Sequence, residues 1–178
     1  IGGEPILHHL ERQLSQVADG IVLVVSPEGL EPIREAAESL ATPTELAVQP
    51  QPIGMADAVL SAREVPTAAA AELLLIVWGD QVVLRAETLR RLVVMLEDAE
   101  ADLALPTRTL ASPYIHFERD REGRLRQVRQ AREDDEMPAM GESDCGVFLV
   151  RREDFFARLA DYVATPSERG KVTGEVNF

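Results

Sequence analysis

Asp80 is the residue of this sequence best placed for chemistry, because it follows an almost unbroken apolar run. Residues 73–78 have the composition of a strand covered on both faces, and Gly79 and Asp80 come directly after them. In open α/β sheets, ligands bind just outside the carboxyl ends of the strands. A single carboxylate beside phosphate-bearing substrates can hold Mg²⁺, an ion that keeps most of its waters. The other interpretation is that Asp80 caps the helix that follows.

A second candidate site lies in residues 49–59, where a predicted strand leads into a predicted helix at Gly54. The free backbone N–H groups and the dipole of a helix start suit an anion or the edge of a base. Gln49 carries both a donor and an acceptor, so it could read the edge of a pyrimidine. A plain loop with a helix cap is the alternative explanation.

The third candidate is a predicted hairpin with the polar segment that follows it, residues 114–146. The segment ends in Gly141–Gly146, where polar residues precede a buried strand. Such side chains can hydrogen-bond the hydroxyl groups of a sugar. An ordinary loop would have the same composition. His116 is expected to face the same pocket.

Alternating strands and helices must position these residues. Apolar periodicity predicts helices over residues 5–18, 30–40, 54–63, 86–98 and 153–163, and strands over residues 21–25, 44–48, 73–78, 103–105 and 145–150. Strands joined by helices through short links indicate right-handed crossovers and a mostly parallel sheet, which is an α/β fold. Asp120–Gly123 separates residues 114–119 from 125–130 and predicts a hairpin turn.

Composition excludes several classes of protein. The net charge of −13 opposes non-specific binding to nucleic acid, and no apolar stretch approaches the roughly 20 residues of a membrane span. The single cysteine, Cys145, excludes an internal disulfide and fits the cytoplasm. The 178 residues fit one domain. Because the chain starts at Ile1 and ends at Phe178, as an apolar run begins, we expect residues 1–178 to be a single domain truncated at both ends.

Seven short segments resemble, in order and spacing, the sugar-1-phosphate nucleotidyltransferases. Residues 49–58 are similar to that family's "QxxxLGTAHAV", residues 75–89 to "LYGDxPLxxxETL" and residues 142–146 to "EINTGI". The remaining similar segments are residues 2–9, 113–119, 128–133 and 173–175. Within the family, the chain resembles the uridylyltransferase domains that make UDP-N-acetylglucosamine. The resemblance implies a three-layer Rossmann-like fold with a β-hairpin insertion on the sugar side.

The resemblance also implies an activity. A nucleotidyl group would pass from a nucleoside triphosphate to a sugar 1-phosphate, releasing pyrophosphate and giving an NDP-sugar, such as a precursor of cell-envelope polysaccharide. Asp80 would be the catalytic ligand of Mg²⁺. The residues expected to contact the nucleotide are Gln49, Gly54, Met55 and Gly79, and those expected to contact the sugar are Tyr114, Gln130 and Asp144. The partners are then the two substrates, with neither nucleic acid nor membrane, and self-association is left open.

The chain departs from the family pattern at several positions, so the base and the sugar stay open. Met55 stands for a threonine, Gln130 for a glutamate and Asp144 for an asparagine. The family's glycine-rich loop "GxGTRM" and its lysine are not in the sequence, and we expect them to precede Ile1. The chain as given would then be a poor catalyst. Two alternatives remain: an inactive nucleotide-sugar-binding sensor or subunit, and a cytidylyltransferase of related fold.

Overall fold

The first half of the chain alternates helices and strands in the computed structural model, which describes residues 2–81, 83–165 and 172–175. Its strands are runs of Ile, Val and Leu, whose stiff or bulky side chains favour extended backbone. In order, the elements are α1 (Ile6–Leu14), β1 (Ile21–Val25), α2 (Leu30–Ala37), β2 (Thr44–Val48), α3 (Met55–Ser61), α4 (Pro66–Ala70), β3 (Leu73–Val77) and α5 (Ala86–Asp98). The sequence did not predict the short helix α4, which starts at a proline, a residue that suits a first helical turn.

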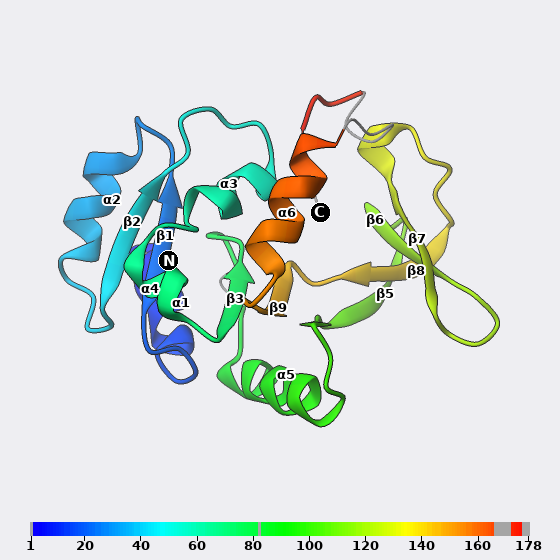
Figure 1. Cartoon of the computed structure of the whole chain (residues 1–178), viewed down its shortest axis with the longest axis horizontal. Helices are drawn as coiled ribbons and strands as arrows, with labels where there is room; N and C mark the ends of the chain where they lie inside the picture. Colours follow the sequence, from blue (N-terminus) through cyan, green and yellow to red (C-terminus); the bar gives the residue numbers. More distant parts are fainter. Residues whose placement is uncertain (1, 82, 166–171, 176–178) are drawn as a thin grey trace.

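The second half of the chain is mostly β-structure. Its elements are β4 (Leu103–Ala104), β5 (Thr107–Ala111), β6 (Ile115–Arg119), β7 (Leu125–Gln130), the 3₁₀ turn η1 (Ala131–Glu133), β8 (Met140–Asp144), β9 (Val147–Arg151) and α6 (Phe155–Ala164). Figure 1 shows β5 to β8 as a lobe on the right, α5 below the centre, and α6 running through the middle beside α3. The α/β fold predicted from the sequence is confirmed, and so is the hairpin of β6 and β7.

The strand directions differ in part from the prediction. β1 and β2 are parallel, as expected. β9 lies between β3 and β4 and is antiparallel to both, so β3 and β4 run in the same direction, as a crossover through α5 requires. The mostly parallel sheet is thus confirmed only in part, because the partner of β3 among the described residues is antiparallel. The chain leaves the sheet after β4, makes the β5–β8 lobe, and re-enters from the opposite end as β9.

The best-packed part of the core lies between α5 and β9. Leu89, Leu92 and Leu96 recur at helical spacing on one face of α5 and are almost fully buried. They pack against Val147 and Leu149 of β9. This contact fixes the sheet from which the Asp80 turn projects.

The strands β1 and β3 are incompletely covered. Within the described part of the chain, β1 pairs with β2 alone and β3 with β9 alone. Apart from Ile21, every residue of the two strands is only partly buried. The sequence predicted a doubly covered central strand at β3, and this coverage is not complete among the described residues.

Three further differences concern the second half. The strands β5 and β8 pair with each other and were not predicted. Cys145 was expected to begin a strand, but it lies in the turn between β8 and β9. The acidic segment 133–136, whose composition is typical of a solvated loop, does more than face solvent. Glu133 accepts hydrogen bonds from Val172 N at 3.3 Å and Thr173 Oγ1 at 2.6 Å, so it holds residues close to the end of the chain.

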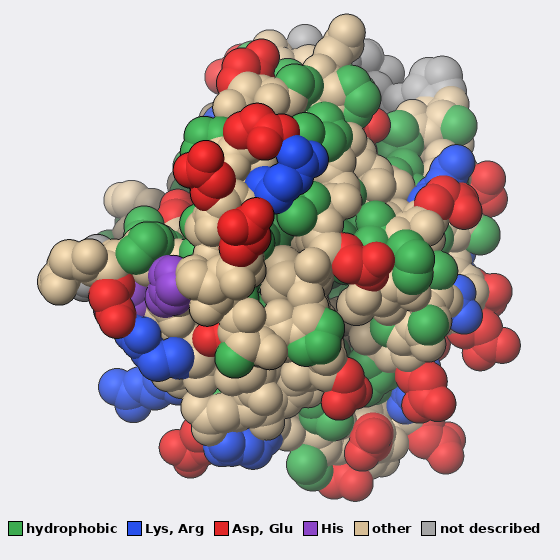
Figure 2. Space-filling model, turned by 90° about the vertical axis from the view of Figure 1, so that its left-hand side faces the viewer, with side chains coloured by type: hydrophobic (Ala, Val, Ile, Leu, Met, Phe, Trp, Pro, Cys, Tyr) green, Lys and Arg blue, Asp and Glu red, His purple; other side chains and the backbone are tan. Residues whose placement is uncertain are grey.

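Charged side chains on one face of the protein do not gather into a patch of a single sign (Figure 2). Figure 2 shows the face at the left of Figure 1, where acidic side chains are scattered with basic ones between them. No helix in the described ranges has the length and apolar composition needed to cross a bilayer.

Candidate functional site

One cleft of about 2320 Å³ is lined by residues from both halves of the molecule. Every residue of β1 and β3 contributes to its lining. All the site residues expected from the sequence also line it: Gln49, Gly54, Met55, Gly79, Asp80, Tyr114, Gln130 and Asp144. The structure thus brings together residues that are up to 95 positions apart in the chain. The role of each residue stays a prediction.

Asp80 is exposed in the turn that follows β3. Its carboxylate makes no hydrogen bond or ion pair with any residue that the structure describes, so both oxygens are available to a ligand. The interpretation of Asp80 as a helix cap was wrong, because α5 begins at Ala86 with Arg85 at the cap position. The Ala86 N–H donates instead to Gln13 Oε1 at 3.2 Å.

The described residues contain no group of three or more His, Cys, Asp or Glu side chains that could hold a metal ion. A closed metal site made of protein ligands alone is therefore not built from them. A single free carboxylate in a cleft still fits Mg²⁺, since this ion is usually bound by one or two carboxylates together with substrate phosphates and water. Asp80 has the chemistry of such a ligand.

Gln49 is held rigidly at the end of β2. Its backbone N–H donates to Val25 O at 2.8 Å, which ties it to the end of β1. Its Nε2 donates to Gly54 O at 3.1 Å and to Asp57 Oδ2 at 2.9 Å. The expectation that Gln49 offers both a donor and an acceptor to a base therefore needs correction, because both amide hydrogens are already used. Only Oε1 remains for a ligand.

Gly54 precedes α3 with a φ of 123°, a conformation that favours glycine. The helix starts at Met55 and ends at Ser61, shorter than the predicted 54–63. With only seven residues, α3 is a weak source of helix dipole, so the anion-binding interpretation of Gly54 loses its basis. Gly54 and Met55 still line the cleft.

On the hairpin side, Tyr114 is half-exposed and its ring is covered by Arg132. The guanidinium carbon of Arg132 lies 5.3 Å from the ring centroid, and its Nη1 donates to Glu175 Oε2 at 3.1 Å. The Gln130 backbone N–H donates to Asp135 Oδ2 at 2.8 Å. These contacts fix the backbone and ring positions of the side chains expected near the sugar.

Asp144 has a structural contact in the turn between β8 and β9. Its Oδ1 accepts a hydrogen bond from Gly146 N at 2.7 Å. Gly146 has a φ of 68°, and a Cβ there would lie 2.8 Å from Trp78 Cδ1 and 2.6 Å from Gln81 Nε2. This turn therefore sits directly against the Trp78–Gln81 segment that carries Asp80. The half-exposed Trp78 also lines the cleft, and the sequence analysis gave it no role.

Arg108 of β5 is a cleft residue that the sequence analysis missed. It is exposed, and its guanidinium makes no hydrogen bond or ion pair with any described residue. Burial raises the pKa of the Cys145 thiol, and the nearby Arg108 charge opposes that shift. A raised pKa makes Cys145 a poor nucleophile. A lone arginine between two threonines carried no signal in the sequence that could have identified it.

His116 does not face the cleft, contrary to expectation. Ile115 and Phe117 of β6 line the cleft, and His116 points to the opposite face because side chains alternate along a strand. There its Nδ1 lies 3.1 Å from Glu142 O.

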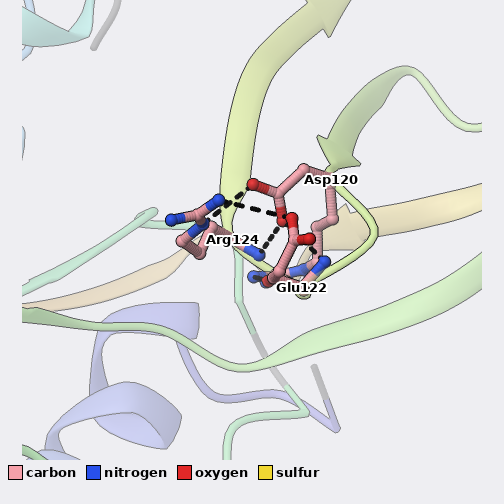
Figure 3. Close-up of polar contacts among 5 residues, drawn as sticks. Asp120, Glu122 and Arg124 are labelled. Atoms are coloured by element: carbon pink, nitrogen blue, oxygen red, sulfur yellow. Dashed lines mark hydrogen bonds and ion pairs between the residues drawn. The ribbon is translucent and has the colours of Figure 1, made fainter.

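Three arginines of the hairpin, Arg119, Arg124 and Arg129, form ion pairs with acidic neighbours. Arg119 donates to both Glu142 carboxylate oxygens, at 2.7 and 2.8 Å, and Arg129 pairs with Glu118 at 2.6 Å. At the turn, Asp120 accepts from the backbone N–H groups of Glu122 and Arg124 and from Arg124 Nε (Figure 3). The hydrogen bond from the Arg124 backbone is the main cause that lowers the pKa of Asp120. These three ion pairs stabilise the hairpin and tie it to β8.

Comparisons with known proteins agree on one family. A family model described as a MobA-like NTP transferase domain matches residues 1–144. The bifunctional protein GlmU of Anaeromyxobacter dehalogenans is 32% identical over 175 residues, which is 95% of this chain and 36% of that protein. GlmU of Pseudomonas putida is 30% identical over 168 residues, which is 92% of this chain and 34% of that protein. The chain thus spans about a third of the length of these relatives.

Solved structures share the fold at low sequence identity. UDP-glucose pyrophosphorylase complexed with UDP-glucose is 12% identical with a TM-score of 0.69, covering 98% of this chain and 72% of that one. The 4-diphosphocytidyl-2C-methyl-D-erythritol synthase of Anaerococcus prevotii is 15% identical with a TM-score of 0.66, covering 97% and 70%. HddC from Yersinia pseudotuberculosis complexed with GMP-PN is 14% identical with a TM-score of 0.62, covering 100% and 71%.

Proposed function

We propose that this chain, which belongs to the family of MobA-like NTP transferase domains, transfers a nucleotidyl group from a nucleoside triphosphate to a sugar 1-phosphate. The observation that carries the proposal is the position of Asp80. An exposed carboxylate, without a partner among the described residues, lines the same cleft as Gln49 and Tyr114. The similarity to GlmU over 95% of the chain supports the same class of reaction.

In this reaction, a phosphate oxygen of the sugar 1-phosphate forms a bond to the α-phosphorus. The bond from that phosphorus to the bridging oxygen breaks, and pyrophosphate leaves with the electron pair. The contribution of the chain is to position the two substrates and to complement charge. Gln49 would fix the base, and Tyr114 with Gln130 would orient the sugar. Asp80 would hold Mg²⁺ together with phosphate oxygens, and the ion would supply charge stabilisation when bound.

We also propose that, in the natural protein, a strand upstream of Ile1 lies between β1 and β3, within the same domain as residues 1–178. Two observations support this. Among the described residues both strands have an unpaired edge, and the cleft that they line, at about 2320 Å³, is larger than the ~300–1,000 Å³ of a usual ligand site. Pro5 and Ile6 line the same cleft, so preceding residues need only a short path to enter it. The loop after such a strand could cradle phosphates with backbone N–H groups.

The test is pyrophosphate exchange by the full-length natural protein. Asp80→Ala is expected to reduce incorporation of labelled pyrophosphate into the nucleoside triphosphate by about 10²–10³-fold, the scale for loss of one electrostatic stabiliser. Asp98→Ala is the matched control, because Asp98 is exposed at the end of α5 and lies outside the cleft. Exchange at the wild-type rate in the Asp80 variant would refute its role. Nucleotide binding without exchange in the unaltered protein would instead indicate a nucleotide-sugar-binding sensor.

A further inference from the structure

Asp57 lies behind Gln49 and does not itself reach the cleft. Gln49 lines the cleft, but Asp57, in the first turn of α3, is not among its lining residues. The contact between them is the 2.9 Å hydrogen bond from Gln49 Nε2 to Asp57 Oδ2. Asp57 can therefore influence a ligand only through Gln49.

The orientation of the Gln49 carboxamide follows from its two neighbours. Gly54 O and an Asp57 carboxylate oxygen are both acceptors, and both lie within hydrogen-bond distance of Nε2. Turning the amide over would place Oε1 against two acceptor oxygens and would leave both without a donor. Buried or half-buried acceptors without a donor cost free energy, so one orientation dominates. Because Gln49 N–H is also bound to Val25 O, neither the backbone nor the side chain of Gln49 is free to adapt.

We infer that Asp57 sets the base selectivity of this cleft by holding Gln49 with only its carboxamide oxygen available to the nucleotide. The inference rests on the proposed function. The base that binds best is then one that directs an N–H group at Gln49 Oε1, and a base that directs an acceptor there is rejected. A residue that reads one fixed polarity discriminates more strongly than one that can turn over.

The substitution Asp57→Asn tests this with almost no change in shape. The introduced amide can either accept from or donate to Gln49, so only Gly54 O still opposes turning the carboxamide over, and the preference for one orientation weakens. The experiment is calorimetric titration of the full-length protein with ATP, CTP, GTP and UTP separately. In the unaltered protein we expect the dissociation constants of the best and worst nucleotide to differ by at least about tenfold. In the variant we expect the spread to shrink to within about threefold, mainly through tighter binding of the rejected nucleotides.

Two controls separate this role from a structural one. Asp98→Asn makes the same chemical change on an exposed helix residue away from the cleft and should leave the spread unchanged. In a Gln49→Ala background, Asp57→Asn should have no further effect on selectivity, because Asp57 acts through the missing side chain. Melting temperatures show whether each variant is folded. If Asp57→Asn is not folded, Asp57→Ala takes its place, since it also removes the acceptor of one Gln49 amide hydrogen.

The outcomes distinguish the inference from the proposed function. If the unaltered protein selects one nucleotide and both Asp57 variants keep the full spread, the inference is wrong while the proposed function stands. An effect of Asp57→Asn that persists in the Gln49→Ala background also overturns it, as does equal binding of all four nucleotides by the unaltered protein. If no nucleotide binds the folded protein, both the inference and the proposed function fail.

Discussion

Two regions of the molecule are stabilised by different kinds of contact. One is the packing of α5 on β9, and the other is the hairpin of β6 and β7. Between α5 and β9, leucine and valine side chains exclude water almost completely. The hairpin lobe is held instead by arginine–carboxylate pairs and by the turn centred on Asp120. Phe117 is the only buried residue of β6 and β7.

Because of this difference, the two regions should respond differently to a change of side-chain volume and to a change of pH. Apolar packing depends on volume and shape and is nearly independent of pH. Partly exposed ion pairs depend on protonation and are individually weak. Residues of both regions line the cleft, among them Leu89 and Val147 on one side and Phe117 and Val128 on the other.

The largest expected effect is on the packed side. Leu96 is 0% exposed, so Leu96→Ala should leave a cavity and lower the free energy of unfolding by about 2–5 kcal/mol. Urea unfolding followed by circular dichroism measures this. Val94→Ala in the same helix is the control, since Val94 is 54% exposed and its truncation should cost well under about 1 kcal/mol. Equal effects of the two substitutions would mean that α5 does not pack as described.

A smaller effect is expected where the two regions meet. Gly146→Ala would place a methyl group against Trp78 and Gln81 in a backbone conformation that disfavours alanine, at a cost of about 1–3 kcal/mol. Gly79→Ala is the matched control, because nothing lies within 4 Å of a Cβ at that position. Thermal unfolding compares the two variants. A melting temperature for Gly146→Ala as high as that of the control would contradict this packing.

The smallest effect belongs to the hairpin lobe and depends on pH. The hydrogen bonds from Arg119 hold the pKa of Glu142 below its ordinary value of 4.5. A lowered pKa contributes stability that is present above the unfolded-state value and is lost as pH falls through the folded-state value. Glu142→Gln should therefore cost about 0.5 kcal/mol at neutral pH and nothing in strong acid. Urea unfolding at pH 7 and pH 2.5 tests this.

The control for that experiment is Glu28→Gln, an exposed glutamate in the turn before α2. The change in the free energy of unfolding caused by Glu28→Gln should be the same at the two pH values. A Glu142→Gln effect that is the same at both pH values would show that the side chain stabilises by packing rather than by charge.

The sequence located the cleft residues because apolar runs mark where strands end. The apolar residues 73–78 predicted a strand, and Asp80 was therefore expected to follow its carboxyl end. The same signal located Gln49 at the end of β2. It did not reveal that Gln49 is bound to Asp57, because that contact requires α3 to fold back beside the end of its own strand.

The sequence also did not predict that β9 would insert between β3 and β4 in the antiparallel direction. Residues 147–151 are apolar in the same way as a parallel strand would be, and direction is decided by the end of the sheet from which the chain returns. The strands β5 and β8 were missed for a different reason. Thr107–Ala111 and Met140–Asp144 lack apolar alternation, because much of β5 is exposed and β8 is rich in small and polar residues.

The strands β1 and β3, each paired on one edge only among the described residues, have a consequence for handling the protein. Among the described residues, β1 and β3 each have one edge whose N–H and C=O groups pair with no other strand, and such an edge can hydrogen-bond to an extended segment of another molecule. A preparation limited to residues 1–178 should therefore oligomerise through added strands and bind dyes that detect exposed apolar surface. A longer version that carries the strand proposed to precede Ile1 should stay monodisperse at the same concentration.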